Sequence, residues 1–242
     1  METRIRLGMI TPSSNTVLEP MTARMLHGLP DITAHFARFR VTRIALTESA
    51  LAQFDPAPLL EAAGLLADAH MDVIAWNGTS ASWLGFETDE RLCAAITAAT
   101  GVPATTSVLA TNHALQRLGA RTIGLVTPYT ADVQQRIVAN YAAAGYPVIA
   151  ERHLDDPGNY SFAQYEEPEL ARLVREVATA RPDVIVALCT NMRATGLVAA
   201  IELQTGLPVI DSIAVTLWHA MSLAGVHPAR VQGWGRLFAT LP

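Results

Sequence analysis

The chain has 242 residues, of which 50% are hydrophobic and 16% charged, and its formal net charge at pH 7 is −5. This length and composition allow one sizeable core or two small lobes around a shared cleft, which disfavours a disordered chain. The net negative charge disfavours nucleic acids and anionic membranes as partners, and no apolar run approaches the roughly 20 residues of a membrane helix. The N-terminal residues also lack the apolar core of a signal peptide, so we expect a cytoplasmic protein with a small-molecule partner.

Short apolar runs rich in β-branched residues alternate along the chain with longer Ala- and Leu-rich segments of helical period. In chain order, strands are predicted at residues 4–10, 33–39, 72–76, 103–106, 122–127, 147–150, 183–188 and 208–210. The helices predicted between them span residues 16–27, 56–70, 87–100, 107–118, 130–144, 168–180, 194–205 and 212–224. Unbroken apolar runs are typical of strands that are buried on both faces of a parallel sheet.

An internal repeat divides the chain into two halves. Four matched pairs lie a nearly constant 105 to 116 residues apart: DVIAWNGTS from Asp72 with DVIVALCTN from Asp183, GMITPSS from Gly8 with GLVTPYT from Gly124, TGVPATTS from Thr100 with TGLPVIDS from Thr205, and His113 with His219. We therefore predict an α/β fold of two lobes related by a pseudo-two-fold axis, each a mostly parallel sheet flanked by helices, with the active site between them. The first lobe comprises residues 1–117, to which the C-terminal helix can be added, and the second comprises residues 118–242.

Polar side chains follow the first and third predicted strands of each half, where ligands bind in open α/β sheets. Because a pseudo-two-fold axis would bring these four turns together, we expect them to line one pocket. The turns carry Ser13, Ser14 and Asn15, then Gly78, Thr79 and Ser80 in the first half, and Tyr129 and Thr130, then Cys189, Thr190 and Asn191 in the second.

Cys189 is the most reactive candidate, since a strand-to-helix turn places helix N-terminal amides where they favour a thiolate. Its repeat partner is Gly78, so the predicted site has one thiol instead of two. A single thiol can deliver or remove a proton on one face of a carbon centre only. The alternative for Cys189 is a buried structural thiol, which is the interpretation we give Cys93 in the middle of an apolar helix.

The hydroxyls of Thr79, Ser80 and Tyr129 are candidate donors to a carboxylate or a developing enediolate. Thr79 and Ser80 could instead cap the next helix. Asn15 and Asn191 are candidates for a second carboxylate clamp, or simply turn formers.

Several cofactor chemistries are disfavoured. All 17 basic residues are arginine, so no lysine can form a Schiff base with pyridoxal phosphate. Two cysteines and seven histidines without ligand spacing predict neither a disulfide framework nor a metal site. Serine hydrolase, phosphate-binding and dinucleotide-binding motifs are missing from the sequence, and we expect no cofactor. The polar segment at residues 151–168 is either a closing lid or an exposed loop.

Two sets of motifs point to known enzymes. The run PSSNT at residues 12–16, followed by Glu19, resembles the N-terminal signature of maleate cis-trans isomerases, and CTN from Cys189 resembles the second-cysteine motif of isomerases and racemases. GTSAS from Gly78, Tyr129 and the C-terminal GWGRLF resemble arylmalonate decarboxylase, which also has glycine where the racemases keep their first cysteine. Over nearly its whole length the chain is thus similar to the aspartate/glutamate racemase superfamily, in the branch that contains these two enzymes.

The resemblance implies a cofactor-free decarboxylase acting on a small substituted malonate or related dicarboxylate. It implies that Thr79, Ser80, Tyr129 and the backbone around Cys189 hold one carboxylate, while the other lies desolvated among apolar side chains and leaves as carbon dioxide. Cys189 then protonates the enediolate from one face. The SSN turn, and Thr190 and Asn191 in place of small residues, depart from the decarboxylase pattern.

Two alternatives follow from these departures. One is a maleate cis-trans isomerase or an aspartate/glutamate-type racemase that uses Cys189 without a paired first cysteine. The other is a dicarboxylate-binding protein without activity. A homo-oligomer is compatible with each of these interpretations.

Overall fold

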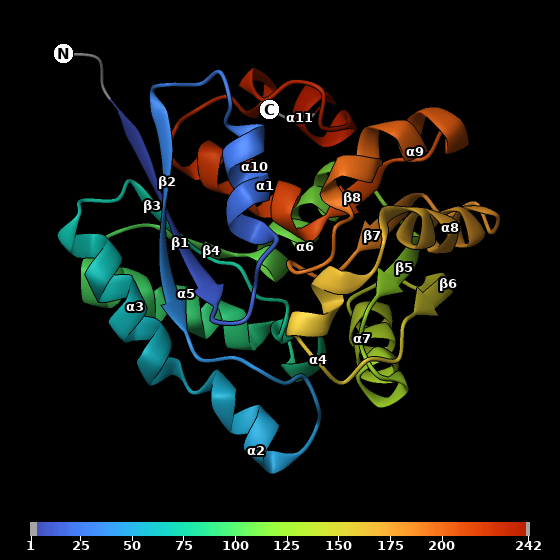
Figure 1. Ribbon diagram of the computed structural model, residues 1–242, viewed down its shortest axis with the longest axis horizontal. Coiled ribbons are helices and arrows are strands. Elements are labelled where there is room, and N and C mark those ends of the chain that lie inside the picture. Colours follow the sequence, from blue (N-terminus) through green and yellow to red (C-terminus); the bar gives the residue numbers. More distant parts are fainter. Residues whose placement is uncertain (1–3, 241–242) are drawn as a thin grey trace.

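Two parallel four-stranded sheets form the centres of two lobes in a computed structural model, which describes residues 4–240 (Figure 1). The strand orders are β2-β1-β3-β4 and β6-β5-β7-β8, so equivalent strands of the two halves occupy equivalent places. This equivalence confirms the α/β fold of two repeated lobes. The ends of the predicted lobes, at residues 1–3 and 241–242, lie outside the described residues.

The first half alternates strands and helices at the positions that its apolar periodicity predicts. Its elements are β1 (Ile5–Pro12), α1 (Leu18–Met25), β2 (Ile32–Phe39), α2 (Glu48–Leu51), the 3-10 helix η1 (Ala52–Phe54), α3 (Pro56–Asp68), β3 (Val73–Trp76), α4 (Ala81–Leu84), α5 (Glu87–Thr100), β4 (Ala104–Thr106) and α6 (Ser107–Arg117).

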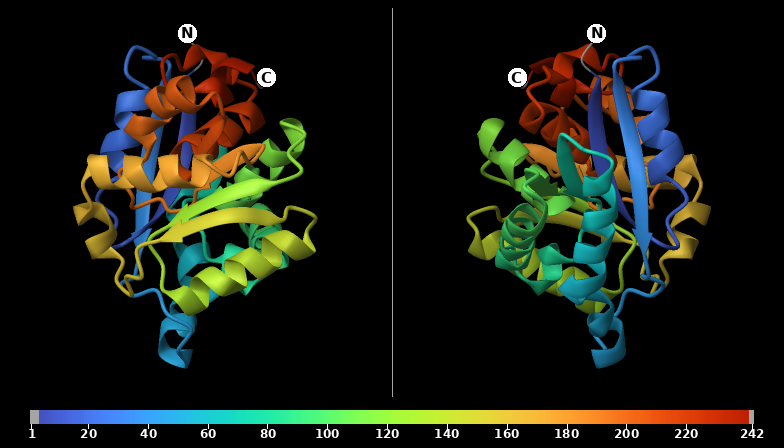
Figure 2. Two further views of the ribbon diagram at one scale, coloured as in Figure 1. Left: turned by 90° about the vertical axis from the view of Figure 1, so that its right-hand side faces the viewer. Right: turned by 90° about the vertical axis from the view of Figure 1, so that its left-hand side faces the viewer.

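The second half repeats the order, and α7 and α8 lie on either side of strands β5 and β6 (Figure 2). Its elements are β5 (Ile123–Thr127), α7 (Ala131–Ala143), β6 (Val148–His153), η2 (Tyr160–Gln164), α8 (Glu167–Ala178), β7 (Val184–Ala187), η3 (Thr195–Leu197), α9 (Val198–Thr205), β8 (Val209–Asp211), α10 (Ser212–Leu223), η4 (Pro228–Arg230) and α11 (Arg236–Thr240). The sequence did not predict α2, α4 and α11, because a helix of four or five residues is too short to show a 3.6-residue period.

The repeat extends to single hydrogen bonds at the strand starts. The carboxylate of Asp72, just before β3, accepts the backbone N–H of Arg6 at 2.7 Å. The carboxylate of Asp183, just before β7, accepts the backbone N–H of Thr122 at 2.9 Å. Each aspartate thus ties the third strand of its half to the first.

The two Thr-Gly pairs end equivalent helices in the same way. Gly101 and Gly206 adopt left-handed backbone at φ 73° and 74° after α5 and α9, a conformation that glycine adopts without strain. The hydroxyls of Thr100 and Thr205 each donate to a carbonyl one turn earlier, at 2.7 and 2.8 Å. The sequence matches therefore reflect matched local structure.

Helices α6 and α10 pack against each other between the two sheets. The repeat-related rings of His113 and His219 stack there, with centroids 4.9 Å apart and planes 25° apart. Nδ1 of His219 lies 2.7 Å from the Thr105 hydroxyl, and burial lowers the His219 pKa to about 4, so the ring is neutral. Since α10 also contacts β3 and β4, the end of the chain contributes to packing of the first lobe. The division at residues 117 and 118 remains our interpretation.

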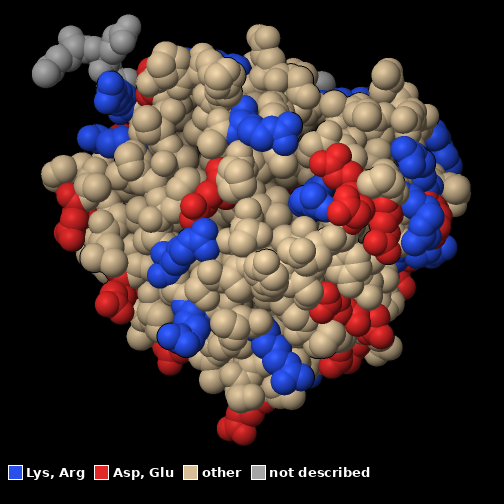
Figure 3. Space-filling model, viewed as in Figure 1, with Lys and Arg blue, Asp and Glu red and all other residues tan. Residues whose placement is uncertain are grey.

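Among the helices described between residues 4 and 240, none combines the length and apolarity needed to cross a membrane. On the face drawn in Figure 3, acidic and basic side chains are interspersed.

Candidate active site

A small cavity of about 20 Å³ lies where the four turns of the repeat meet. Its wall includes Pro12 from the first turn, Gly78, Thr79 and Ser80 from the second, Tyr129 from the third, and Cys189 and Thr190 from the fourth. The remaining lining residues are Val41, Ile44, Phe54, Trp76, Trp83 and Asn159. A volume of this size holds about one water molecule, so a substrate must displace part of the wall.

Cys189 is 3% exposed and its thiol lies in the cavity wall. Burial raises the pKa of this thiol to about 12, although the backbone amides of Asn191 and Met192 and the Tyr129 hydroxyl act in the opposite direction. The nearest of these amides, that of Asn191, lies 3.3 Å from Sγ. Burial thus opposes the thiolate that the sequence analysis expected and favours the protonated thiol.

The physical reason lies in the chain after Cys189. The sequence analysis expected a helix N-terminus next to the thiol, but an irregular turn follows it and the next helical element, η3, begins only at Thr195. Without helix amides beside it, the sulfur has too few donors to offset its burial. A protonated thiol is suited to donate a proton, and it is a poor nucleophile.

Tyr129 joins the two lobes at the cavity. Its hydroxyl shares a hydrogen bond of 2.5 Å with the hydroxyl of Thr79 and contacts Cys189. Burial raises the Tyr129 pKa well above its usual value, so the phenol keeps its proton. The rings of Trp83 and Phe162 contact the Tyr129 ring edge-on at centroid distances of 5.1 and 5.6 Å, which fixes its orientation.

Two further donors face the same region. The indole Nε1–H of Trp83 is buried and has no hydrogen-bond partner among the described residues. The Ser80 hydroxyl likewise makes no hydrogen bond within residues 4–240, although Ser80 occupies the N-cap position of α4. A buried donor left unpaired costs roughly 1–3 kcal/mol, so an acceptor supplied by a ligand would stabilise the Trp83 indole.

Gly78 is covered by the ring of Trp76. A Cβ atom at position 78 would lie 1.9 Å from Cζ2 of that indole, so a side chain there would require the ring to shift. Trp76 is itself buried and packs against Phe39 at a ring-centroid distance of 4.9 Å. The space that a first cysteine would take is thus occupied by an aromatic ring.

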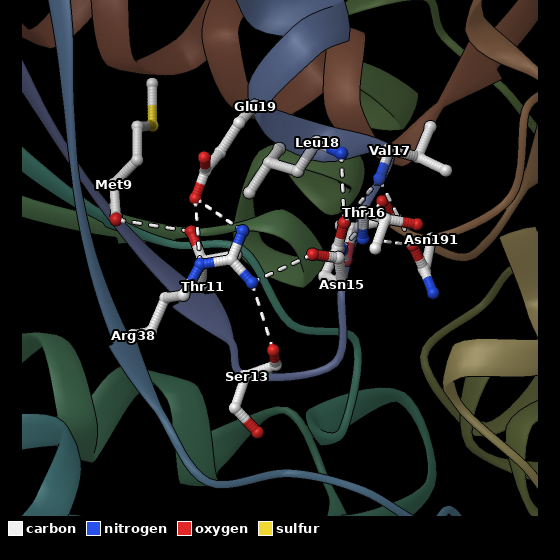
Figure 4. A network of polar contacts seen from close by, with 11 residues as sticks. Met9, Thr11, Ser13, Asn15, Thr16, Val17, Leu18, Glu19, Arg38 and Asn191 are labelled. Carbon is white, nitrogen blue, oxygen red and sulfur yellow. Dashed lines mark hydrogen bonds and ion pairs between the residues drawn. The ribbon is translucent and has the colours of Figure 1, made fainter.

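Asn15 and Asn191 hold the two lobes together. Asn15 Nδ2 donates to the carbonyl of Thr190 at 2.9 Å, and its Oδ1 accepts the backbone N–H groups at the start of α1. Asn191 Oδ1 accepts the backbone N–H of Thr16 at 2.9 Å, and its Nδ2 donates to the carbonyl of Asn159 at 2.7 Å. Figure 4 shows the contacts of Asn15 with the start of α1 and of Asn191 with Thr16, on the turn after β1. Their amides are fully engaged with protein partners.

The other predicted substrate-binding residues lie around this core. The Ser14 hydroxyl donates to the carbonyl of Val41 at 2.7 Å, and that of Ser13 to the same carbonyl at 3.3 Å. The Thr190 hydroxyl donates to the carbonyl of Asn77 at 2.9 Å. The Thr130 hydroxyl donates to the Asp132 carboxylate outside the cavity lining.

Arg38 on β2 supports the first turn from outside. Its guanidinium donates to the carbonyls of Ser13 and Asn15, both at 3.0 Å, and to the carboxylate of Glu19 at 2.7 Å (Figure 4). The turn is therefore held by a charged clamp that the sequence analysis did not identify.

The segment at residues 151–168 closes one side of the site. Asn159 lines the cavity, and its Nδ2 donates to the Ser14 hydroxyl at 2.9 Å. Phe162 on η2 is fully buried against Tyr129. The central part of segment 151–168 is thus packed against the site and forms part of its wall. The turn-rich sequence of this segment has no local pattern that could indicate this.

Asp211 lies behind Cys189 at the end of β8. One carboxyl oxygen accepts the backbone N–H groups of Ile213 and Ala214 and the Thr195 hydroxyl, whereas the other is buried without a described partner. Burial raises the pKa of Asp211 to about 6, and its charge raises the pKa of the Cys189 thiol. Among the described residues no group of three or more His, Cys, Asp or Glu side chains is arranged to hold a metal ion.

The chain is similar over nearly its whole length to known proteins. A family model described as arylmalonate decarboxylase matches residues 7–238. The chain is 29% identical to an arylmalonate decarboxylase from Bordetella bronchiseptica, over 96% of this chain and 95% of that protein. It is 30% identical to a maleate isomerase from Pseudomonas putida, with 97% of each chain covered.

Solved structures of both kinds share the fold. A crystal structure of a maleate isomerase from Pseudomonas putida matches with a TM-score of 0.87 at 27% identity and covers 98% of each chain. A crystal structure of arylmalonate decarboxylase matches with a TM-score of 0.79 at 28% identity, covering 97% of this chain and 99% of the other.

Proposed function

Because the chain belongs to the arylmalonate decarboxylase family, and is thus an enzyme of the lyase or isomerase class, we propose that it is a cofactor-independent decarboxylase of a small substituted malonate or related dicarboxylate. One observation carries the proposal: the cavity contains a single thiol, and the repeat-equivalent position is a glycine covered by Trp76. One thiol is sufficient to protonate one face of a carbanion.

In the proposed complex, neutral donors hold one carboxylate of the substrate. Thr79, Tyr129 and Ser80 supply hydroxyls, and Trp83 supplies its unpaired Nε1–H. Donors that are already fixed in place stabilise the negative charge that develops on an enediolate without reorganising. Asn15, Asn191, Thr190, Ser13 and Ser14 position the turns that carry these donors.

The second carboxylate lies against apolar wall. Val41, Ile44 and Phe54 line the cavity, and none of its lining residues is charged. A carboxylate that loses its water there without gaining a cation is destabilised relative to neutral carbon dioxide. The site thus favours the step that removes this charge.

The proposed reaction balances without a co-reactant. The bond between C2 and the leaving carboxylate breaks, its electron pair stays on the substrate as an enediolate, and carbon dioxide departs. Cys189 transfers its thiol proton to C2, which gives a monocarboxylate and a thiolate, and the thiolate regains a proton from water. Since burial raises the Cys189 pKa to about 12, the thiol is loaded with its proton before each turnover.

Maleate isomerisation is the second candidate, because the maleate isomerase from Pseudomonas putida is also similar. Addition of Cys189 to a carbon–carbon double bond needs the thiolate. Burial raises the pKa of the Cys189 thiol to about 12 and so disfavours that thiolate. The protonation state therefore supports decarboxylation over isomerisation.

A substrate panel in deuterated water tests the proposal. Phenylmalonate and methylmalonate are expected to release carbon dioxide and to take up one deuterium at C2. Fumarate formed from maleate, without decarboxylation, would support the isomerase instead. Exchange of the α-proton of an amino acid would indicate a racemase, and binding without turnover would indicate an inactive binding protein; either result overturns the proposal.

A further inference from the structure

Asp211 is a buried acid beside the strand that leads to Cys189. It is the last residue of β8, it is fully buried, and it pairs in register with Ala187, two residues before the thiol. Its hydrogen-bond donors are uncharged, and none of the ion pairs found within residues 4–240 includes it. The second lobe therefore buries a carboxyl next to its reactive sulfur without a described counter-ion.

One oxygen of Asp211 anchors the turn that carries the thiol. Its Oδ1 accepts the hydroxyl of Thr195 at 2.8 Å, and Thr195 opens η3, the first helical element after Cys189. At the start of the same turn, the backbone N–H of Leu188 donates to the carbonyl of Val126 on β5 at 2.9 Å. The turn is thus fixed at one end by β5 and at the other by Asp211.

The second oxygen of Asp211 is not needed for this structural role. The helix cap and the anchor both use Oδ1, whereas Oδ2 is buried without a partner among the described residues. In the first half, Thr106 caps the equivalent helix with a single hydroxyl oxygen, which accepts the N–H of Leu109 at 3.0 Å. Because a buried acceptor left unpaired costs roughly 1–3 kcal/mol, stability alone does not favour a carboxyl at position 211.

The charge of Asp211 acts on the sulfur. It raises the pKa of the Cys189 thiol, in opposition to the backbone N–H of Asn191 and the hydroxyl of Tyr129. A negative charge behind the sulfur disfavours a second negative charge on it. In the proposed reaction the thiol must hold its proton until the enediolate forms and must regain a proton afterwards, so this charge serves both steps.

Other titratable groups on the elements that pack against β8 have partners elsewhere. Glu202 on α9 accepts the backbone N–H groups of Val209, at the opposite end of β8, and of Arg236 on α11. His219 on α10 bonds to a hydroxyl of the first lobe. Burial raises the pKa of Asp211 to about 6, and its three uncharged donors act in the opposite direction. Its charge is therefore present at pH 8 and largely lost at pH 5.

We propose that Asp211 is a positioning residue for Cys189: it anchors the turn that carries the thiol through Thr195, and its unpartnered carboxylate oxygen holds the proton on the sulfur. The inference rests on the proposed function only where it assigns that proton to C2 of the substrate. The effect of Asp211 on the thiol itself can be measured without any substrate.

The rate of thiol modification at two pH values tests the proposal. Methyl methanethiosulfonate, a small neutral reagent that reacts with thiolates, is used on proteins that all carry Cys93→Ala, so Cys189 is the only thiol. Asp211→Asn keeps the accepting oxygen and removes the charge. It is expected to react at the parent rate at pH 5 and about three- to tenfold faster at pH 8, since a thiol of lower pKa yields more thiolate of slightly weaker nucleophilicity.

Matched variants separate charge from structure. Asp89→Asn removes the buried acid of the first half and is expected to leave the Cys189 rate unchanged at both pH values. Thr195→Val removes the anchor and keeps the charge, so it is expected to change the rate by the same factor at pH 5 and pH 8. Asp211→Thr, which copies Thr106 of the first half, replaces Asp211→Asn if the amide variant does not fold.

The outcomes distinguish this inference from the proposed function. If removing the Asp211 charge changes the rate equally at pH 5 and pH 8, or not at all, Asp211 does not hold the proton and the inference is wrong. Decarboxylation of phenylmalonate by the unmodified protein would then still support the proposed function. If the rate responds to Asp211 only at pH 8 but no malonate is decarboxylated, the proposed function fails and the role of Asp211 toward the thiol stands.

Discussion

The two lobes carry opposite arrangements at the same strand end. In the first lobe β3 ends at the large Trp76, and position 78 has no side chain; in the second, β7 ends at the small Ala187, and the equivalent position is Cys189. The bulky residue and the small one have exchanged places between the halves. This difference shows that packing, as well as sequence, limits the site to one thiol. The Trp76 ring fills the space that a cysteine side chain at position 78 would need.

The next strand ends differ in a related way. Thr106 at the end of β4 and Asp211 at the end of β8 both cap the following helix through a side-chain oxygen. The carboxyl of Asp211 adds a buried acid behind the thiol, whereas Thr106 contacts a buried acid, Asp89, that comes from α5. Each half therefore buries an acid near this strand end, and each acid raises the pKa of a thiol: Asp89 that of Cys93 and Asp211 that of Cys189. Only the second of these thiols lines the cavity.

The largest expected effect comes from removing the thiol. Cys189→Ala is expected to lower kcat by about 10³-fold or more, because this thiol is the proposed proton donor to C2 and the only thiol in the described cavity lining. The thermal midpoint should change little, since only one sulfur atom is lost. Cys93→Ala removes a half-buried thiol that lies outside the cavity lining; this variant serves as the control and should retain full activity. Turnover that survives in the Cys189 variant would remove this thiol from the mechanism.

Making the first lobe resemble the second is the next largest change. Gly78→Cys alone is expected to destabilise the protein or leave it unfolded, because its Cβ would overlap the Trp76 ring. The double variant Trp76→Ala with Gly78→Cys copies the arrangement of Ala187 and Cys189, and is expected to fold. It should exchange the α-proton of 2-phenylpropionate in deuterated water, which unmodified protein does not do at a comparable rate.

Trp76→Ala alone is the control for the double variant. It is expected to cost about 3–5 kcal/mol of stability through the cavity that it leaves, without any proton exchange. If the double variant folds but shows no exchange, the side chains at positions 78 and 189 do not reach opposite faces of the same carbon atom.

Tyr129→Phe is expected to reduce kcat by roughly ten- to a thousandfold, because the hydroxyl is proposed to stabilise the enediolate. Tyr141→Phe is the matched control: Tyr141 is equally buried, and its hydroxyl has no hydrogen-bond partner among the described residues. Steady-state kinetics on both variants separate the loss of a donor from the loss of packing. Equal rates for the two variants would assign Tyr129 to packing alone.

Much of the fold could be predicted because it depends on local patterns. Buried strands, Thr-Gly helix ends and the aspartates before β3 and β7 each leave a signal within a few residues, and the repeat doubles that signal. The four turns were identified for the same reason, since strand ends mark where ligands bind.

The remaining features depend on contacts between distant segments. In the sequence, Trp76 looks like an ordinary core residue of β3. Only its contact with Gly78 in the structure shows that its ring occupies the space for a second thiol. Trp83 lies on a helix of four residues, and Asn159 lies in a turn-rich stretch, so neither has a periodic signal. The Cys189 pKa was misjudged because burial by other segments outweighs the local amides.

The smallest effect concerns the buried acid of the first lobe. Burial raises the Asp89 pKa from 3.8 to about 7, so its folded-state pKa exceeds the unfolded value. The protonated form is therefore favoured by folding: its contribution to stability is complete below pH 4 and is lost as the pH rises to about 7. At about 1.4 kcal/mol per pH unit, the loss amounts to a few kcal/mol.

Asp89→Asn mimics the protonated acid and is expected to remove this loss. Urea unfolding should give similar free energies of unfolding for the variant and the unmodified protein at pH 4, and a higher value for the variant at pH 8. Asp68→Asn, at an exposed position on α3, is the control and should track the unmodified protein at both pH values. A lower free energy of unfolding for Asp89→Asn than for the unmodified protein at pH 8 would contradict this prediction. It would mean that protein contacts stabilise the Asp89 carboxylate, and that the first lobe buries a charged acid instead of a neutral one.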